Sequence, residues 1–128
     1  MAYLAAVVVT IAVGLLVHLR GAPLGPVARD VLGDALWAAM VAWGAGALAP
    51  GVRLAARSAV AYAVCAAVEA SQLYHAPALD AIRATRAGHL ALGSGFDARD
   101  LLAYALGVAG AALLEAAVVA RGRRLRAA

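Results

Sequence analysis

The chain begins with an apolar run of 18 residues, from Ala2 to Leu19. At a rise of about 1.5 Å per residue, a helix of this length spans roughly 27 Å, close to the thickness of the hydrocarbon core of a bilayer. Hydrophobic residues make up 66% of the chain and charged residues 14%, a composition that is unusual for a soluble globular protein of this length. The run therefore predicts a first transmembrane helix.

A cleaved signal peptide is the alternative interpretation of this first run. It is not favoured, because no Lys or Arg precedes the run and no clear small-x-small cleavage site precedes Pro23. Residues 20–29 are rich in Gly and Pro, which predicts a loop. A second span is predicted over residues 31–49, and the last span over residues 101–120.

The third span is short of apolar residues. The gap without charged residues between Arg57 and Glu69 contains only 11 residues, roughly 16 Å of helix against about 30 Å of hydrocarbon. A helix can cross there only if it includes Glu69. The sequence therefore predicts a third span over residues 54–74, with Glu69 and Gln72 in the membrane or just beneath its headgroups.

Residues 77–88 have a different pattern. Apolar residues such as Leu79 and Ile82 share the segment with charged residues, and Pro stands at its start and Gly at its end. This pattern is typical of an amphipathic helix that lies on the membrane surface. The expected fold is a single all-α transmembrane domain over residues 1–128, an integral membrane four-helix bundle with a short amphipathic surface helix between the third and fourth spans.

All eleven basic residues are Arg, and the seven acidic residues balance the seven that precede Arg121. The net charge of +4 therefore belongs to a basic tail, residues 121–128. Four crossings place both termini on one side, with six arginines there and five on the other side. The positive-inside rule then predicts cytoplasmic termini. Nucleic acid is not an expected partner, because no aromatic residues interleave with the basic ones.

Polar residues are predicted to gather at the membrane face opposite the termini. Glu69 and Gln72 lie three residues apart and hence on one helix face, and an ionisable residue within a span is a functional candidate because its charge is costly in lipid. Asp100 and Tyr104 share a face of the fourth span, whereas Asp97 is expected to cap that helix. Arginines are the expected partners of the acids. The predicted binding residues are Arg29, Asp34, Glu69, Gln72, Arg83, Arg86, Asp100 and Tyr104.

Two interpretations of Glu69 stay open at this point. It can belong to a ligand site, or it can form an interhelical hydrogen bond or carry a proton. In each case its side chain is expected to face the other helices, because lipid offers it no partner. Glu115, near the opposite end of the bundle, could be neutralised by Arg53, Arg57 or Arg121.

No metal site and no cofactor are predicted. His18, His75 and His89 have no metal-ligand spacing, and the chain contains no P-loop, dinucleotide fingerprint or nucleophile elbow. No catalytic residue is assigned, and Cys65 in its apolar run is expected to be a packing residue. The aromatic residues expected to face lipid or the membrane interface are Tyr3, Trp37, Trp43 and Tyr62.

Many of these residues form an ordered series. The series is Arg29, Gly33-Asp34, Glu69-x-x-Gln72, Leu79-Asp80-x-x-Arg83-x-Thr85, Gly93-x-x-Phe96 and Asp100-x-x-x-Tyr104-x-x-Gly107. It resembles the bacterial family catalogued as domain of unknown function 2809 over nearly the whole chain. The resemblance implies a short four-helix, multi-pass protein of the bacterial cytoplasmic membrane, without an assigned activity.

A more distant similarity is to the VanZ-like family, which is linked to glycopeptide resistance. That family has Glu-x-x-Gln on one helix and Asp-x-x-x-Asn-x-x-Gly on a later one. Glu69, Gln72, Asp100 and Gly107 match this pattern, whereas Tyr104 stands where the family has Asn. The similarity therefore implies no shared mechanism.

The leading functional hypothesis is recognition of a lipid or cell-envelope headgroup by the outward polar cluster. Arginines would contact an anion, and the acidic and amide side chains would orient them or bind a hydroxyl or an amine. One alternative is a membrane enzyme that uses Glu69 or Asp100 as general acid or base. The other is a structural or assembly subunit of a membrane complex. A non-enzymatic role is favoured, with membrane lipids as partners and a second copy or another membrane protein as further possible partners.

Overall fold

A computed structural model describes residues 2–93 and 95–127 of the chain. Within these residues it contains helices and no strand. The elements are α1 (Ala2–Arg20), the 3-10 helix η1 (Ala22–Leu24), α2 (Pro26–Leu48), α3 (Leu54–Ser71), α4 (Pro77–Arg83), α5 (Arg86–Leu92) and α6 (Ala98–Ala127). Four of these described helices, α1, α2, α3 and α6, are long and apolar enough to cross a membrane. The predicted all-α membrane bundle is confirmed.

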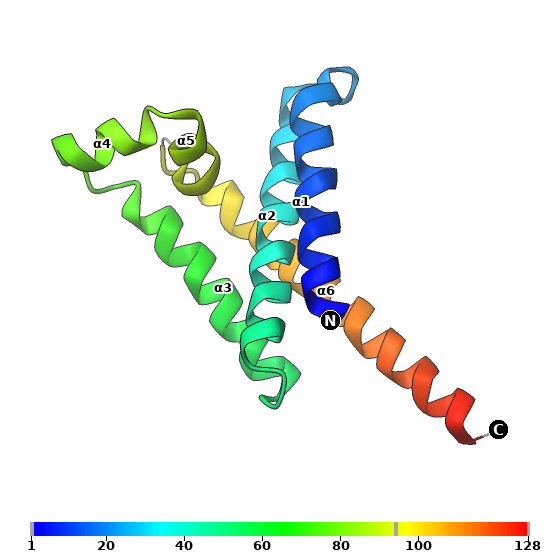
Figure 1. Ribbon diagram of the computed structural model, residues 1–128. Coiled ribbons are helices and arrows are strands. Elements are labelled where there is room, and N and C mark those ends of the chain that lie inside the picture. Colours follow the sequence, from blue (N-terminus) through cyan, green and yellow to red (C-terminus); the bar gives the residue numbers. More distant parts are fainter. Residues whose placement is uncertain (1, 94, 128) are drawn as a thin grey trace.

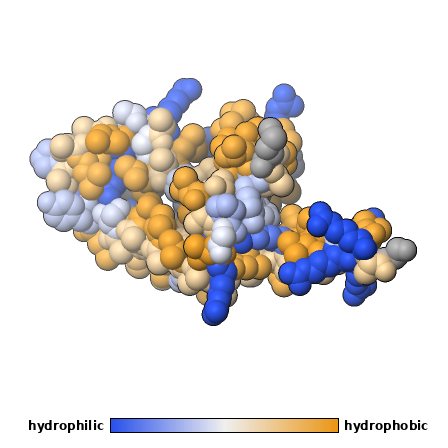
Figure 2. Space-filling view, turned by 60° about the horizontal axis from the view of Figure 1, so that its bottom comes forward, coloured by the Kyte–Doolittle hydropathy of each residue, from blue (hydrophilic) through white to orange (hydrophobic). Residues whose placement is uncertain are grey.

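Helix α2 lies at the centre of the bundle and packs against α1, α3 and α6 (Figure 1). The connection between α1 and α2 lies at the same end as α4 and α5, which we call the α5 end (Figure 1). The opposite end, here the terminal end, carries the N-terminus, the α2–α3 connection and the C-terminal part of α6. Figure 2 shows this terminal end, where hydrophilic residues gather on the C-terminal part of α6 beside a largely hydrophobic surface.

Small side chains dominate the core. The buried cluster consists of Ala38, Ala61, Cys65, Tyr104 and Val108. Small residues let helix backbones approach closely, which is a main source of packing energy between helices in lipid. Cys65 is fully buried, which confirms its predicted packing role.

The contact between α2 and α6 depends on Gly107. A Cβ atom at this position would lie 2.0 Å from the backbone oxygen of Ala35, far inside van der Waals contact. Ala103 and Ala111 on the same face of α6 are buried as well. These three small residues, spaced by four, let α6 approach α2 closely.

We expect Gly107→Ala to lower the free energy of unfolding by about 3 kcal/mol, because the added methyl group overpacks the α2–α6 contact. Gly110 provides a matched control, since it lies in the same helix and no atom approaches its Cβ position within 4 Å. Gly110→Ala should instead gain up to about 1 kcal/mol from helix propensity. Thermal unfolding in detergent, followed by circular dichroism, measures both. Equal stability of the two variants would contradict the close contact.

Helix α3 ends at Ser71, three residues before the predicted end at Tyr74. The Arg83 guanidinium accounts for this end, because it donates to the backbone oxygens of Ser71 at 2.7 Å and Tyr74 at 2.9 Å. A positive group at a helix C-terminus satisfies carbonyls that the helix itself leaves free. Arg83 thereby fixes α4 against the end of α3.

The segment predicted as one helix over residues 77–88 forms two helices, α4 and α5. Thr85 begins the second of them as its N-cap, because its Oγ1 accepts a hydrogen bond from the Gly88 N–H at 3.0 Å. A Cβ atom on Gly88 would lie 1.9 Å from the backbone oxygen of Ile82. The tight turn between the two helices therefore requires glycine at this position.

Helix α6 is longer than the predicted span over residues 101–120. It begins at Ala98 and continues through the arginine-rich tail to Ala127; residue 128, the last of the predicted tail, lies outside the described residues. No proline interrupts the helix, and Gly122, the one glycine within residues 121–127, costs only about 1 kcal/mol of helix propensity. The tail is thus a helical extension of α6 that leaves the bundle (Figure 1).

Candidate functional site

Glu69 is the most deeply placed polar group at the α5 end, with a relative exposure of 0%. Its carboxylate accepts three hydrogen bonds, from the Asp97 backbone N–H at 2.6 Å, the Gln72 Nε2 at 3.0 Å and the Tyr104 hydroxyl at 3.0 Å. The side chain faces the other helices, as predicted. Glu69 thus joins the end of α3 to the start of α6.

The Gln72 carboxamide is held against the segment that follows α5. A Cβ atom on Gly93 would lie 2.4 Å from Gln72 Nε2, and Gly93 has a φ of +65°. Both the conformation and the space therefore require glycine there. Gln72 is 5% exposed, and its Oε1 has no hydrogen-bond partner among the described residues.

Asp34 on α2 and Asp100 on α6 form the accessible acidic part of the site. Both side chains line the same cavity, and the two helices that carry them pack against each other. Both residues are half-buried. Two carboxyl groups in one cavity lining, with no basic partner among the described residues, favour a proton or a cation beside them.

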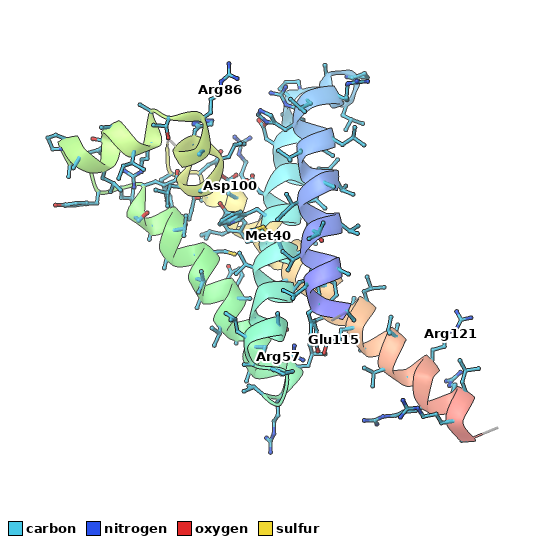
Figure 3. All side chains as sticks on the ribbon, viewed as in Figure 1. Met40, Arg57, Arg86, Asp100, Glu115 and Arg121 are labelled. Atoms are coloured by element: carbon cyan, nitrogen blue, oxygen red, sulfur yellow. The ribbon has the colours of Figure 1, made fainter. Side chains whose placement is uncertain are left out.

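The polar groups around Glu69 line one cavity of about 840 Å³, whereas Glu69 itself is not part of the lining. Its polar side includes Asp34, Gln72, Asp100 and Tyr104, and its rim includes Arg29 and the exposed His18 and His89. Apolar side chains from α1 and α2 form the remaining wall, among them Ile11, Leu15, Leu36, Trp37 and Met40. Figure 3 places Asp100 toward the α5 end and Met40 deeper in the bundle. The cavity is therefore amphipathic along its length.

The structure does not bring the predicted arginines to these acids. Arg83 caps α3, and the exposed Arg86 points away from the bundle (Figure 3). Arg29 lies near its neighbour Asp30, with 3.8 Å between the closest charged atoms. Within residues 2–93 and 95–127, no arginine forms an ion pair with Glu69, Asp34 or Asp100. The predicted pairing is therefore wrong, because Arg83 is held at the end of α3, Arg29 lies nearer to Asp30, and Arg86 points away from the bundle.

Asp97 has the capping role that its position predicts. Its Oδ1 accepts a hydrogen bond from the backbone N–H of Arg99 at 2.9 Å, and the Arg99 guanidinium approaches its Oδ2 at 2.6 Å. The hydrogen bond from the Arg99 side chain lowers the pKa of the Asp97 carboxyl below its usual range. Asp97 therefore stays ionised and neutralises the one arginine at the start of α6.

A second polar cluster, at the terminal end, was only partly predicted. Arg57 Nη2 donates to Glu115 Oε1 at 2.6 Å, which confirms Arg57 as a partner of Glu115. The Tyr3 hydroxyl donates to the same carboxylate at 2.7 Å. Gly46 leaves the space for the Tyr3 ring and the Arg57 guanidinium. Trp43 packs beside Tyr3 and is only 9% exposed, so the prediction that Trp43 faces lipid is wrong.

The signals for this second cluster were weak in the sequence. Tyr3 and Glu115 are separated by 112 residues, and nothing in their spacing relates them. The sequence related Glu115 to Arg57 only through their predicted position at the same end of the bundle, where Arg53 and Arg121 were equally possible partners. The described residues contain no group of three or more His, Cys, Asp or Glu side chains that could hold a metal ion.

Comparison with known proteins places most of the site in one family. The family model described as "Protein of unknown function (DUF2809)" matches residues 24–108 of the chain. This range contains all eight predicted binding residues, from Arg29 to Tyr104, and excludes both Tyr3 and Glu115 of the second cluster. No solved structure matches the chain significantly.

Proposed function

The chain belongs to the DUF2809 family of proteins of unknown function, and we propose that it binds a membrane lipid, or a lipid-linked cell-envelope precursor, in the cavity at the α5 end. The observation that carries this proposal is the amphipathic lining of the cavity. Acidic and amide groups at one side can bind a polar headgroup, and the apolar wall of α1 and α2 can contact acyl chains. Cytoplasmic termini would make this an outward-facing site.

Binding is better supported than catalysis by Glu69. A general acid or base must reach the proton that it transfers. Glu69 is fully buried behind the Gln72 and Tyr104 side chains that donate to it. Its geometry suits a positioning residue, which leaves Asp34 and Asp100 as the carboxyl groups that a ligand can reach.

A steric substitution tests the cavity without changing its charge. Gly33 on α2 lines the cavity, and no atom lies within 4 Å of its Cβ position. We therefore expect Gly33→Phe to leave the fold intact, to fill the cavity and to reduce the co-purified lipid about tenfold, equivalent to the loss of roughly 1.4 kcal/mol of binding free energy. Mass spectrometry of the protein released from mild detergent measures the lipid retained per chain.

Gly44→Phe is the matched control. Gly44 lies on the same helix with equally open space at its Cβ position, but it is outside the cavity lining. This variant should retain lipid like the unmodified protein. If Gly33→Phe keeps the same lipid as Gly44→Phe, the cavity is not the binding site and the proposed function is wrong.

A further inference from the structure

The cavity offers free hydrogen-bond acceptors rather than free donors around its buried polar groups. The Gln72 Nε2 and the Tyr104 hydroxyl both donate to Glu69. What Gln72 leaves free is its Oε1, an acceptor on a side chain that is 95% buried and that lines the cavity. A buried acceptor without a partner costs free energy that a donating ligand would recover.

The charges around the cavity favour a cation. Each arginine at its edge already lies beside an acid, Arg29 at 3.8 Å from Asp30 and Arg99 at 2.6 Å from Asp97. In the described part of the chain, Asp34 and Asp100 have no such basic partner, and both line the cavity together with Gln72. An anion placed here would be repelled, whereas a cation would be attracted to both carboxyl groups.

Three classes of cation could satisfy this requirement, and the geometry separates them. A bare proton would leave the Gln72 acceptor and the cavity unfilled. A calcium or magnesium ion takes six or more oxygen ligands, and the described residues contain no metal-binding group of three or more acidic, His or Cys side chains. An ammonium group carries three N–H donors. This number equals the number of acceptor groups, which are the carboxyl groups of Asp34 and Asp100 and the amide oxygen of Gln72.

We infer that the group recognised by Asp34, Asp100 and Gln72 is a primary ammonium, as in an aminoethyl phosphate or amino-sugar headgroup. This inference rests on the proposed function, since it names the chemistry of the ligand in the same cavity. It also replaces the anion predicted beside the acids, because Arg83 is held at the end of α3 and Arg86 points away from the bundle. A phosphate on the same headgroup would lie nearer the rim, where Arg29 and Arg99 line the cavity.

The test compares three lipids in nanodiscs: phosphatidylethanolamine, which carries N–H donors, phosphatidylcholine, whose quaternary ammonium has none, and anionic phosphatidylglycerol. Lipid retained by the protein is measured by native mass spectrometry. Hydrogen bonds to charged groups predict that phosphatidylethanolamine is retained about tenfold over the other two lipids. Asp34→Asn/Asp100→Asn should abolish this preference, whereas Asp80→Asn, which removes an acid outside the cavity lining, should keep it.

The outcomes separate this inference from the proposed function. If lipid is lost in Gly33→Phe but the unmodified protein shows no preference for phosphatidylethanolamine, lipid binding stands and the ammonium site is wrong. Equal retention of phosphatidylcholine would overturn the donor argument, and preferred phosphatidylglycerol would overturn the charge argument. Soluble ethanolamine, added as a competitor, shows whether the site takes a free amine or a lipid headgroup. Displacement of the retained phosphatidylethanolamine at millimolar ethanolamine assigns a free amine. Retention of the lipid under these conditions assigns the lipid headgroup.

Discussion

Replacing Glu69 with alanine is expected to lower the free energy of unfolding by about 4 kcal/mol, because each buried donor left without an acceptor costs on the order of 1–3 kcal/mol. Three donors lose their partner together: the Asp97 backbone N–H, the Gln72 carboxamide and the Tyr104 hydroxyl. Because the Glu69 carboxylate is fully buried, no other acceptor among the described residues takes its place. Thermal unfolding in detergent measures the loss.

Two companion variants show whether the hydrogen bonds or the charge of Glu69 carry this stability. Glu69→Gln keeps one acceptor oxygen, so its free energy of unfolding should fall less than that of Glu69→Ala. Tyr104→Phe removes a single donor and should cost about 1 kcal/mol. An exposed acid that makes no contact with this cluster, Asp30, gives the control, and Asp30→Ala should change stability by less than about 0.5 kcal/mol. Stability of Glu69→Ala equal to that of Asp30→Ala would show that Glu69 does not join α3 to α6.

Much of this cluster could be predicted from the sequence. The apolar stretch after Arg57 is too short to span a bilayer alone, which required Glu69 inside the span and hence facing the bundle. The spacing of Glu69 and Gln72 placed both on one helix face, and the structure joins them by a hydrogen bond of 3.0 Å. The length of a span and the spacing of residues on a helix face are local properties, so they can be predicted without knowledge of the fold.

The partners of the charged residues could not be predicted in the same way. Arg83 lies at the right membrane level for the acids, but its nearest acceptors are backbone oxygens at the end of α3. That Asp34 and Asp100 line one cavity depends on how closely α2 and α6 approach, and Gly107 allows that approach. The predicted topology gives only the depth of each residue in the membrane. It does not specify which helices are neighbours at that depth.

The break between α4 and α5 had a signal that hydropathy alone does not reveal. Thr85 is followed three residues later by Gly88, and the threonine hydroxyl caps the first turn of α5 by accepting the Gly88 N–H. An amphipathic pattern continues through this point, so periodicity predicts one helix. The N-cap preference of threonine was the competing local signal.

The second large effect is expected at the terminal end, where Arg57 and Glu115 form an ion pair with side-chain exposures of 7% and 14%. Arg57→Leu should lower the free energy of unfolding by about 3–5 kcal/mol, because it leaves the Glu115 charge buried without a cation. The Tyr3 hydroxyl, which donates to the same carboxylate, cannot neutralise it. Chemical or thermal unfolding in detergent measures this change.

The double variant Arg57→Leu/Glu115→Leu decides between a stabilising pair and a costly unpaired charge. Removing both charges leaves no buried ion, and apolar replacements of buried pairs are often neutral. The double variant should therefore be more stable than either Arg57→Leu or Glu115→Leu. Additive losses would instead show that the two residues act independently. Because Figure 3 places Arg57 and Glu115 at the end opposite to Asp100, lipid retention should stay unchanged in the double variant, so that stability and ligand binding are measured as separate properties of the two ends.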